Sequence, residues 1–248
     1  WLGSKRSMMK RKEQGATLIV VLMLLLAITI IGTLAIRQSL VSLNIATNSQ
    51  ATQLMLQNSD AAIFNVEDST NLARSLARDG MFGYIKTDSN KGKELVFCFR
   101  GSNTQFFNLS DASLIYLNDS GTLVDTDLGV AGYCQSGGTN NFFTSNRRAV
   151  MTQVSVSFVA NAAGSQPFED SVRGTDDDIP LDKRQKVIVH AVSLMPTIST
   201  ATTANIDTCL RRLSNSTNAN FSINACLTNL NVPFTTHVTE YTLGQEFL

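Results

Sequence analysis

The chain has 248 residues, enough for one domain or for a domain with an appendage. Hydrophobic residues make up 43% of the sequence and charged residues 16%, a composition that excludes an intrinsically disordered chain. Residues 1–15 hold five basic residues and one acidic residue, so the remaining chain has 15 basic and 19 acidic residues, and this net charge of about −4 argues against a nucleic-acid-binding groove.

A long apolar segment follows the basic residues. Residues 16–36 carry no charge, and as a helix they would be about 31 Å long, enough to span the hydrocarbon core of a bilayer. Five positive charges precede the segment and only Arg37 follows it closely, which predicts a single pass with the N-terminus in the cytoplasm. A cleaved signal peptide is disfavoured, because the apolar core is too long and Thr33-Leu34-Ala35 is a poor cleavage site.

Residues 37–80 continue the helical pattern. They contain no proline, and their only glycine is Gly80. The pattern predicts one helix from Ala16 to Gly80, about 95 Å long, with an amphipathic second half. The alternative is an anchor followed by a separate linker helix, which would be polar on all sides. The expected apolar stripe contains Leu40, Leu43, Ala46 or Thr47, Gln50, Leu54 and Ala61, with Met55, Ala62 and Val66 beside it.

After Gly80 the sequence changes to short strand-like runs separated by Asn, Gly, Ser and Thr. Residues 205–230 have a partly helical pattern. A meandering antiparallel sheet laid on the long helix is expected, which places the chain in the α+β class. The predicted strands cover residues 94–100, 114–117, 122–125, 150–158, 187–195 and 235–243, and Asn118-Asp119-Ser120-Gly121 is the turn of a hairpin.

All four cysteines lie in the part predicted to be exported: Cys98, Cys134, Cys209 and Cys226. An even number of widely spaced cysteines outside the cytoplasm predicts two disulfides, with three connectivities to choose from. The pairs Cys98–Cys134 and Cys209–Cys226 are favoured because short loops close most readily. A zinc site is disfavoured because no CxxC pair exists.

Signals of enzyme chemistry are weak. The two histidines, His190 and His237, both lie in strand-like runs, and no GxSxG, Walker A or HExxH motif is present. Neither a catalytic site nor a cofactor is therefore expected. The run Asp176, Asp177 and Asp178 is a weak calcium candidate, but it lacks EF-hand spacing, so a solvated acidic loop is preferred and no metal is predicted. The doublets Arg147-Arg148 and Arg211-Arg212 are interpreted as surface charges, and a nucleic-acid partner is not expected.

The junction at Gly15 is the most specific motif. A short basic leader ends in glycine, and Ala16-Thr17-Leu18-Ile19 opens the apolar run. This resembles type IV prepilins, which implies that prepilin peptidase cuts between Gly15 and Ala16 and methylates the new N-terminus while the apolar segment is retained. The family usually has glutamate at the fifth mature position, where this chain has Val20. By resemblance that carboxylate pairs with the subunit above, so its absence implies the topmost subunit, at the filament tip.

The resemblance is closest to PilX-type minor pilins of bacterial type IV pili. It implies a pilin-like α+β fold, a structural subunit rather than an enzyme, and a place in the tip complex that initiates pilus assembly and supports twitching motility and cell adhesion. The implied partners are other minor pilins, the major pilin, a tip adhesin, the inner-membrane assembly platform and prepilin peptidase. The protein would begin in the bacterial inner membrane and move to the pilus tip. The implied division is a cleaved cytoplasmic leader (1–15), a transmembrane half-helix (16–36), an amphipathic half-helix (37–80) and a periplasmic or extracellular β-rich domain (81–248).

Two alternatives stay open. A K-type tip pseudopilin of a type II secretion system also lacks the glutamate and caps a filament, but that family usually carries a large helical insertion for which this chain has little room. A membrane-anchored periplasmic binding module would keep its leader and have a ligand pocket.

Overall fold

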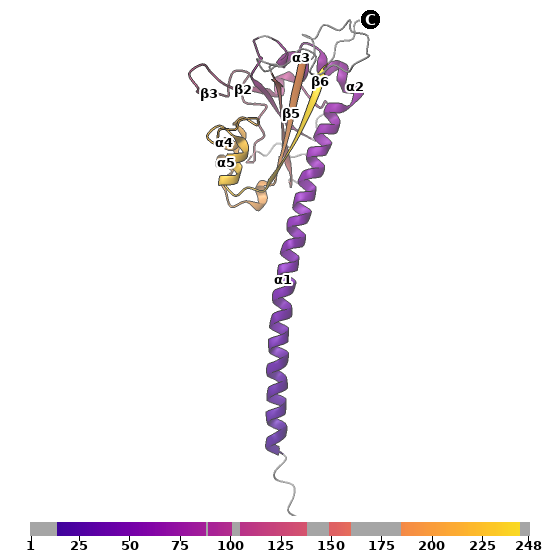
Figure 1. The fold of residues 1–248 in the computed structure, drawn as a ribbon, viewed down its shortest axis with the longest axis vertical. Coiled ribbons are helices and arrows are strands. Elements are labelled where there is room, and N and C mark those ends of the chain that lie inside the picture. Colours follow the sequence, from indigo (N-terminus) through magenta and orange to yellow (C-terminus); the bar gives the residue numbers. More distant parts are fainter. Residues whose placement is uncertain (1–13, 88, 101–104, 138–148, 160–184, 244–248) are drawn as a thin grey trace, which may run out of the picture. The chain divides into compact units, whose positions relative to one another are not determined.

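The computed structural model describes residues 14–87, 89–100, 105–137, 149–159 and 185–243. The chain divides into two compact units, residues 1–50 and residues 51–248. The helix α1 (Gln14–Glu67) begins in the first unit and ends in the second, and the rest of the second unit is a sheet with short helices (Figure 1). The long N-terminal helix and the α+β class are therefore as predicted.

Helix α1 has 54 residues, and its composition explains its length. It contains no proline, and its apolar half is rich in leucine and alanine, which favour the helix, with β-branched residues among them. The hydroxyls of Thr29 and Thr33 donate to the carbonyls of Leu26 and Ile30 at 2.8 and 2.9 Å, so these side chains satisfy their hydrogen bonds within the helix. All side chains described between residues 17 and 50 are exposed.

The predicted single helix to Gly80 is wrong beyond Glu67. Asp68 has an extended backbone conformation, and its carboxylate accepts hydrogen bonds from the Thr70 backbone N–H at 2.9 Å and from the Thr70 hydroxyl at 2.8 Å. It therefore caps a new helix, α2 (Ser69–Leu76), because an Asp side chain satisfies N–H groups that a helix start leaves free. Gly80 precedes a further helix, α3 (Met81–Ile85), and a Cβ at this position would collide with the carbonyl oxygens of Arg74 and Ser75.

Within the described ranges the sheet has six antiparallel strands, in the order β3-β2-β1-β4-β5-β6. The expected hairpin joins β2 to β3, and the interior position of β5 agrees with its apolar sequence. The sheet is not a simple meander, because β1 lies between β2 and β4. The strands are β1 (Glu94–Phe99), β2 (Ala112–Leu117), β3 (Leu123–Val124), β4 (Met151–Val159), β5 (Gln185–Leu194) and β6 (Phe234–Leu243).

One face of the sheet packs against the last turns of α1 and against α3. The predicted stripe on α1 is only partly correct, since Leu54 and Ala61 are exposed whereas Met55, Ala62, Ile63 and Val66 are buried. A buried polar contact also joins the layers: the Ser59 hydroxyl donates to the Ser193 hydroxyl at 2.8 Å. At the surface Asp60 and Glu67 contact His237 and Tyr241 of β6, both at 2.9 Å. Burial against the sheet therefore fixes the end of α1 in the second unit.

The other face of the sheet is covered in part by two short helices, α4 (Thr203–Leu210) and α5 (Ile223–Asn229). The disulfide Cys209–Cys226 joins them, and Cys98–Cys134 ties β1 to the segment after β3. The predicted pairing is thus confirmed. Both disulfides belong to one apolar cluster with residues such as Ile206, Leu210, Ile223 and Leu227. Two 3₁₀ turns, Leu109–Asp111 and Pro196–Ile198, complete the described elements.

Candidate functional site

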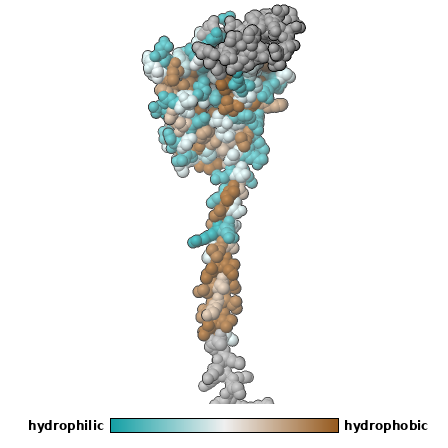
Figure 2. All heavy atoms as spheres, in the orientation of Figure 1, coloured by the Kyte–Doolittle hydropathy of each residue, from teal (hydrophilic) through white to brown (hydrophobic). Residues whose placement is uncertain are grey.

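The apolar half of α1 is the most prominent surface feature. Every large apolar side chain from Leu18 to Ile36 is more than half exposed, and Figure 2 shows the hydrophobic colour extending along this part of the helix. The first unit thus leaves all of this surface uncovered by its own residues, which is unfavourable in water. Among the residues that the structure describes, α1 is the single helix long and apolar enough to cross a membrane. It could therefore anchor the chain in a bilayer.

The predicted processing residues lie at the start of this helix. Gly15 and Ala16 are in the first turn of α1, and Val20 is on the next turn with 56% of its surface exposed. Between Gln14 and Ser59 the helix has one charged residue, Arg37. An acidic partner for an N-terminal amine is therefore absent from this stretch of the described helix.

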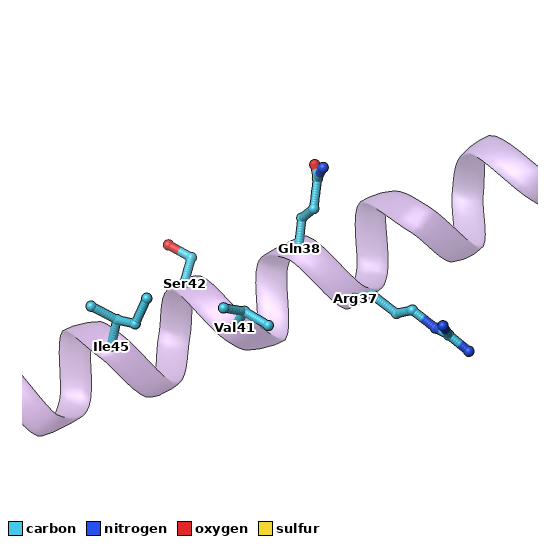
Figure 3. Close-up of a pocket in the computed structure, with 5 residues that line it drawn as sticks. All are labelled: Arg37, Gln38, Val41, Ser42 and Ile45. Carbon is cyan, nitrogen blue, oxygen red and sulfur yellow. The ribbon is translucent and has the colours of Figure 1, made fainter.

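A shallow hollow lies where the apolar half of α1 gives way to its mixed half. Figure 3 shows that its lining side chains, Arg37, Gln38, Val41, Ser42 and Ile45, all come from successive turns of one helix. Arg37 and Gln38 point to different sides of that helix, and no second element among the described residues of the first unit lines the hollow. A small-molecule site normally needs a concave wall on several sides. This hollow is therefore a feature of a bare helix surface rather than a ligand pocket.

Large apolar side chains remain exposed on α1 well beyond the predicted membrane segment. Phe64 is the extreme case, with 71% of its surface exposed although it lies only one residue from the buried Ile63. None of these side chains is buried within its own unit, so folding of the described chain does not remove them from water. The set is Leu40, Val41, Leu43, Ile45, Leu54, Leu56 and Phe64.

The two histidines do not form a hydrolytic site with the described residues. His190 is buried on β5, opposite Ser155 of β4, and burial lowers the pKa of its imidazole. No described residue makes a hydrogen bond to either of its ring nitrogens, so it lacks the acid that orients a catalytic histidine. His237 contacts Asp60 at 2.9 Å, but this contact is on the other face of the sheet and joins β6 to α1.

Glu94 is a buried carboxylate that sequence reasoning missed. Its side chain is 1% exposed, and its two oxygens accept hydrogen bonds from the backbone N–H groups of Ser214 at 2.8 Å and of Asn215 at 3.1 Å. Burial raises the pKa of this carboxyl, and the two backbone hydrogen bonds oppose that rise. Its cross-strand partners are Ile115 on β2 and Ser157 on β4. Glu94 therefore fixes the loop between α4 and α5 to the sheet rather than serving chemistry at a cleft.

The charged clusters considered in the sequence give no metal or phosphate site in the described chain. Asp176, Asp177 and Asp178 lie outside the described residues, as do Arg147 and Arg148. Arg211 forms an ion pair with Asp125 at 2.8 Å, so its guanidinium holds the segment after β3. Elsewhere in the described ranges no three His, Cys, Asp or Glu side chains gather closely enough to hold a metal ion.

Comparisons with models of protein families, with curated proteins and with solved structures found no match for this chain.

Proposed function

We propose that this protein is a minor pilin of a type IV pilus, anchored in the inner membrane before assembly and placed in the tip complex that initiates the filament. The observation that carries the proposal is the continuous helix α1, whose uncharged first part is followed by seven exposed large apolar side chains outside the predicted membrane span. A lone membrane anchor needs lipid-facing residues only within the bilayer. Apolar residues that continue beyond the bilayer need cover from another protein surface to be shielded from water.

A bundle of similar helices provides that cover. In such a bundle the exposed side chains Leu43, Leu54 and Phe64 would pack against helices of neighbouring subunits, while Met55 and Ile63 remain packed on their own sheet. The second unit, with its two disulfides, would stay outside as the surface presented to the partners. Other minor pilins, the major pilin and a tip adhesin are the proposed partners, and no catalytic role is assigned.

The motif at Gly15 and Ala16 supports processing by prepilin peptidase, and Val20 supports the topmost position. An ionised carboxylate inside the membrane is costly without a partner. A subunit with no subunit above it has no amine to neutralise that charge, so an apolar side chain suits this place.

The first experiment is the mass and N-terminal sequence of the mature protein purified from its own host. A start at methylated Ala16 is expected. An intact leader would favour the membrane-anchored binding module, and a start beyond Ala35 would favour a cleaved signal peptide. Either result contradicts the proposal.

A second experiment addresses assembly. Phe64→Asp should reduce the amount of this protein in sheared surface fibres by about tenfold, because a charge replaces an apolar contact between helices. Phe64→Leu, which keeps an apolar side chain at the same exposed position, is the matched control and should have little effect. Equal recovery of the two variants would contradict packing through this face.

A third experiment separates tip from shaft and pilus from secretion. Val20→Glu should lower the number of fibres, and full piliation with this variant would contradict the tip position. Co-purification with pilus subunits is expected, whereas co-purification with a type II secretion pore would assign the chain to the K-type pseudopilins.

A further inference from the structure

Helix α2 has an unusual orientation for an amphipathic helix. Ser75 is its single buried side chain, whereas Leu72 and Leu76 are 41% and 47% exposed. These leucines are four residues apart and therefore lie on the same face of the helix. A helix that buries a serine and exposes two leucines leaves its apolar contact area available to another molecule.

A groove separates α2 from the segment 105–107. It is lined by Asn71, Arg74 and Ser75 on the helix and by Gln105, Phe106 and Phe107 on the other side. The two phenylalanines are held by edge-on contacts to the strand β1. Phe106 lies 5.3 Å from Phe97 and Phe107 lies 5.1 Å from it, between ring centroids. The apolar wall of the groove is thus fixed to the core of the sheet before any ligand arrives.

The polar groups of the groove are rich in hydrogen-bond donors. Ser75 is only 4% exposed, and it lines the groove. Arg74 is exposed and forms no ion pair within the described ranges. The carboxamides of Asn71 and Gln105 add further N–H donors. A guanidinium, a hydroxyl and two carboxamides together match a carboxylate, which accepts several hydrogen bonds in one plane.

We propose that this groove docks an acidic side chain, Asp or Glu, carried by an exposed segment of a partner protein. The carboxylate would bind Arg74 and the Ser75 hydroxyl, and apolar side chains next to it would pack on Leu72 and Leu76, which neighbour Ser75 around the helix. Positive charge favours this partner over a basic one. The inference stands apart from the pilus proposal, because it rests on the second unit alone.

The test uses the full chain in detergent micelles and three immobilised pools of degenerate peptides. Each peptide has two leucines four residues apart with a fixed residue between them, which is Glu in the first pool, Gln in the second and Lys in the third. The Glu pool should retain the protein at least about tenfold more strongly than the other two, and rising salt should weaken that retention.

Substitutions locate the site. Arg74→Glu should abolish the preference for the Glu pool and create one for the Lys pool, and Arg74→Gln should remove the preference without reversing it. Arg78→Glu is the matched control, because it makes the same charge change on an exposed arginine that does not line the groove. Circular dichroism of each variant checks that it is folded.

Equal retention of the three pools by the unaltered chain overturns the proposal. So does the same loss of binding in the Arg74→Glu and Arg78→Glu variants, since that result would show a general charge effect rather than a groove.

Discussion

Replacing Glu94 tests how the loop between α4 and α5 is held on the sheet. In Glu94→Ala the backbone N–H groups of Ser214 and Asn215 lose their acceptor. An unsatisfied buried donor costs about 1–3 kcal/mol, and the cost is smaller for Asn215 because that residue is exposed and water can reach it. We therefore expect a loss of about 2–4 kcal/mol in the free energy of unfolding, with the disulfides intact.

Two assays check this value. Denaturant unfolding of the full chain in detergent, followed by near-ultraviolet circular dichroism, gives the change in stability. Hydrogen exchange read by mass spectrometry should show faster exchange at Ser214 and Asn215 in the variant. Glu240→Ala is the control: Glu240 forms a surface ion pair with Lys186 at 3.3 Å, and its loss should cost less than about 1 kcal/mol.

The pH dependence gives a second criterion. Because burial raises the pKa of Glu94 in the folded protein, the folded state holds this proton more tightly than the unfolded state does. Its contribution to stability is present at low pH and is lost as the pH rises above the ordinary carboxyl pKa. The side chain introduced by Glu94→Gln does not titrate. The free energy of unfolding of this variant, relative to that of the unaltered protein, should therefore be higher at neutral pH than at acidic pH. Equal effects of Glu94→Ala and Glu240→Ala, or the opposite pH trend for Glu94→Gln, would refute the reasoning.

Three further predictions concern single positions. Asp68→Ala removes the cap of α2 and should cost about 1 kcal/mol in unfolding free energy by denaturant titration, whereas Asp68→Asn should cost less. Gly132→Ala should lower the free energy of unfolding by several kcal/mol, because its Cβ would collide with the backbone of β1 and β2. Gly32→Ala has open space around it and should leave the stability of the second unit unchanged. Burial lowers the pKa of His190, so the free energy of unfolding should fall as the pH drops below the ordinary histidine pKa. In His190→Phe the midpoint temperature of thermal unfolding should therefore differ less between about pH 5.5 and 7.5 than it does in the unaltered protein.

Local patterns predicted most of the elements, because strand alternation and helix-forming runs are properties of neighbouring residues. The strand β4 was expected at residues 150–158 and occupies Met151–Val159. The break after Glu67 was missed because Asp68, Ser69 and Thr70 lie in a stretch without glycine or proline, so the capping signal was read as part of a continuous helix.

Apart from the disulfide pairing, features that depend on residues far apart in the chain were not predictable. Strands β1 and β4 are neighbours because residues 53 (152 − 99) to 63 (157 − 94) positions apart pair with each other, which no local pattern encodes. Glu94 stands at the first position of its strand, where a charged residue normally faces water, and its burial follows from the loop 120 residues later. The groove beside α2 was missed for the same reason, since Gln105 and Phe107 meet Arg74 only in the folded chain.

The contacts between α1 and β6 have a consequence for biogenesis. Asp60 meets a partner 177 residues later, and Glu67 meets one 174 residues later. These turns of α1 can therefore complete their packing only after the last strand, β6, has been synthesised. Ordering that depends on such distant pairing is slow. During this interval the face of α1 that the sheet later buries is uncovered, so the nascent second unit exposes apolar surface that chaperones of unfolded chains bind.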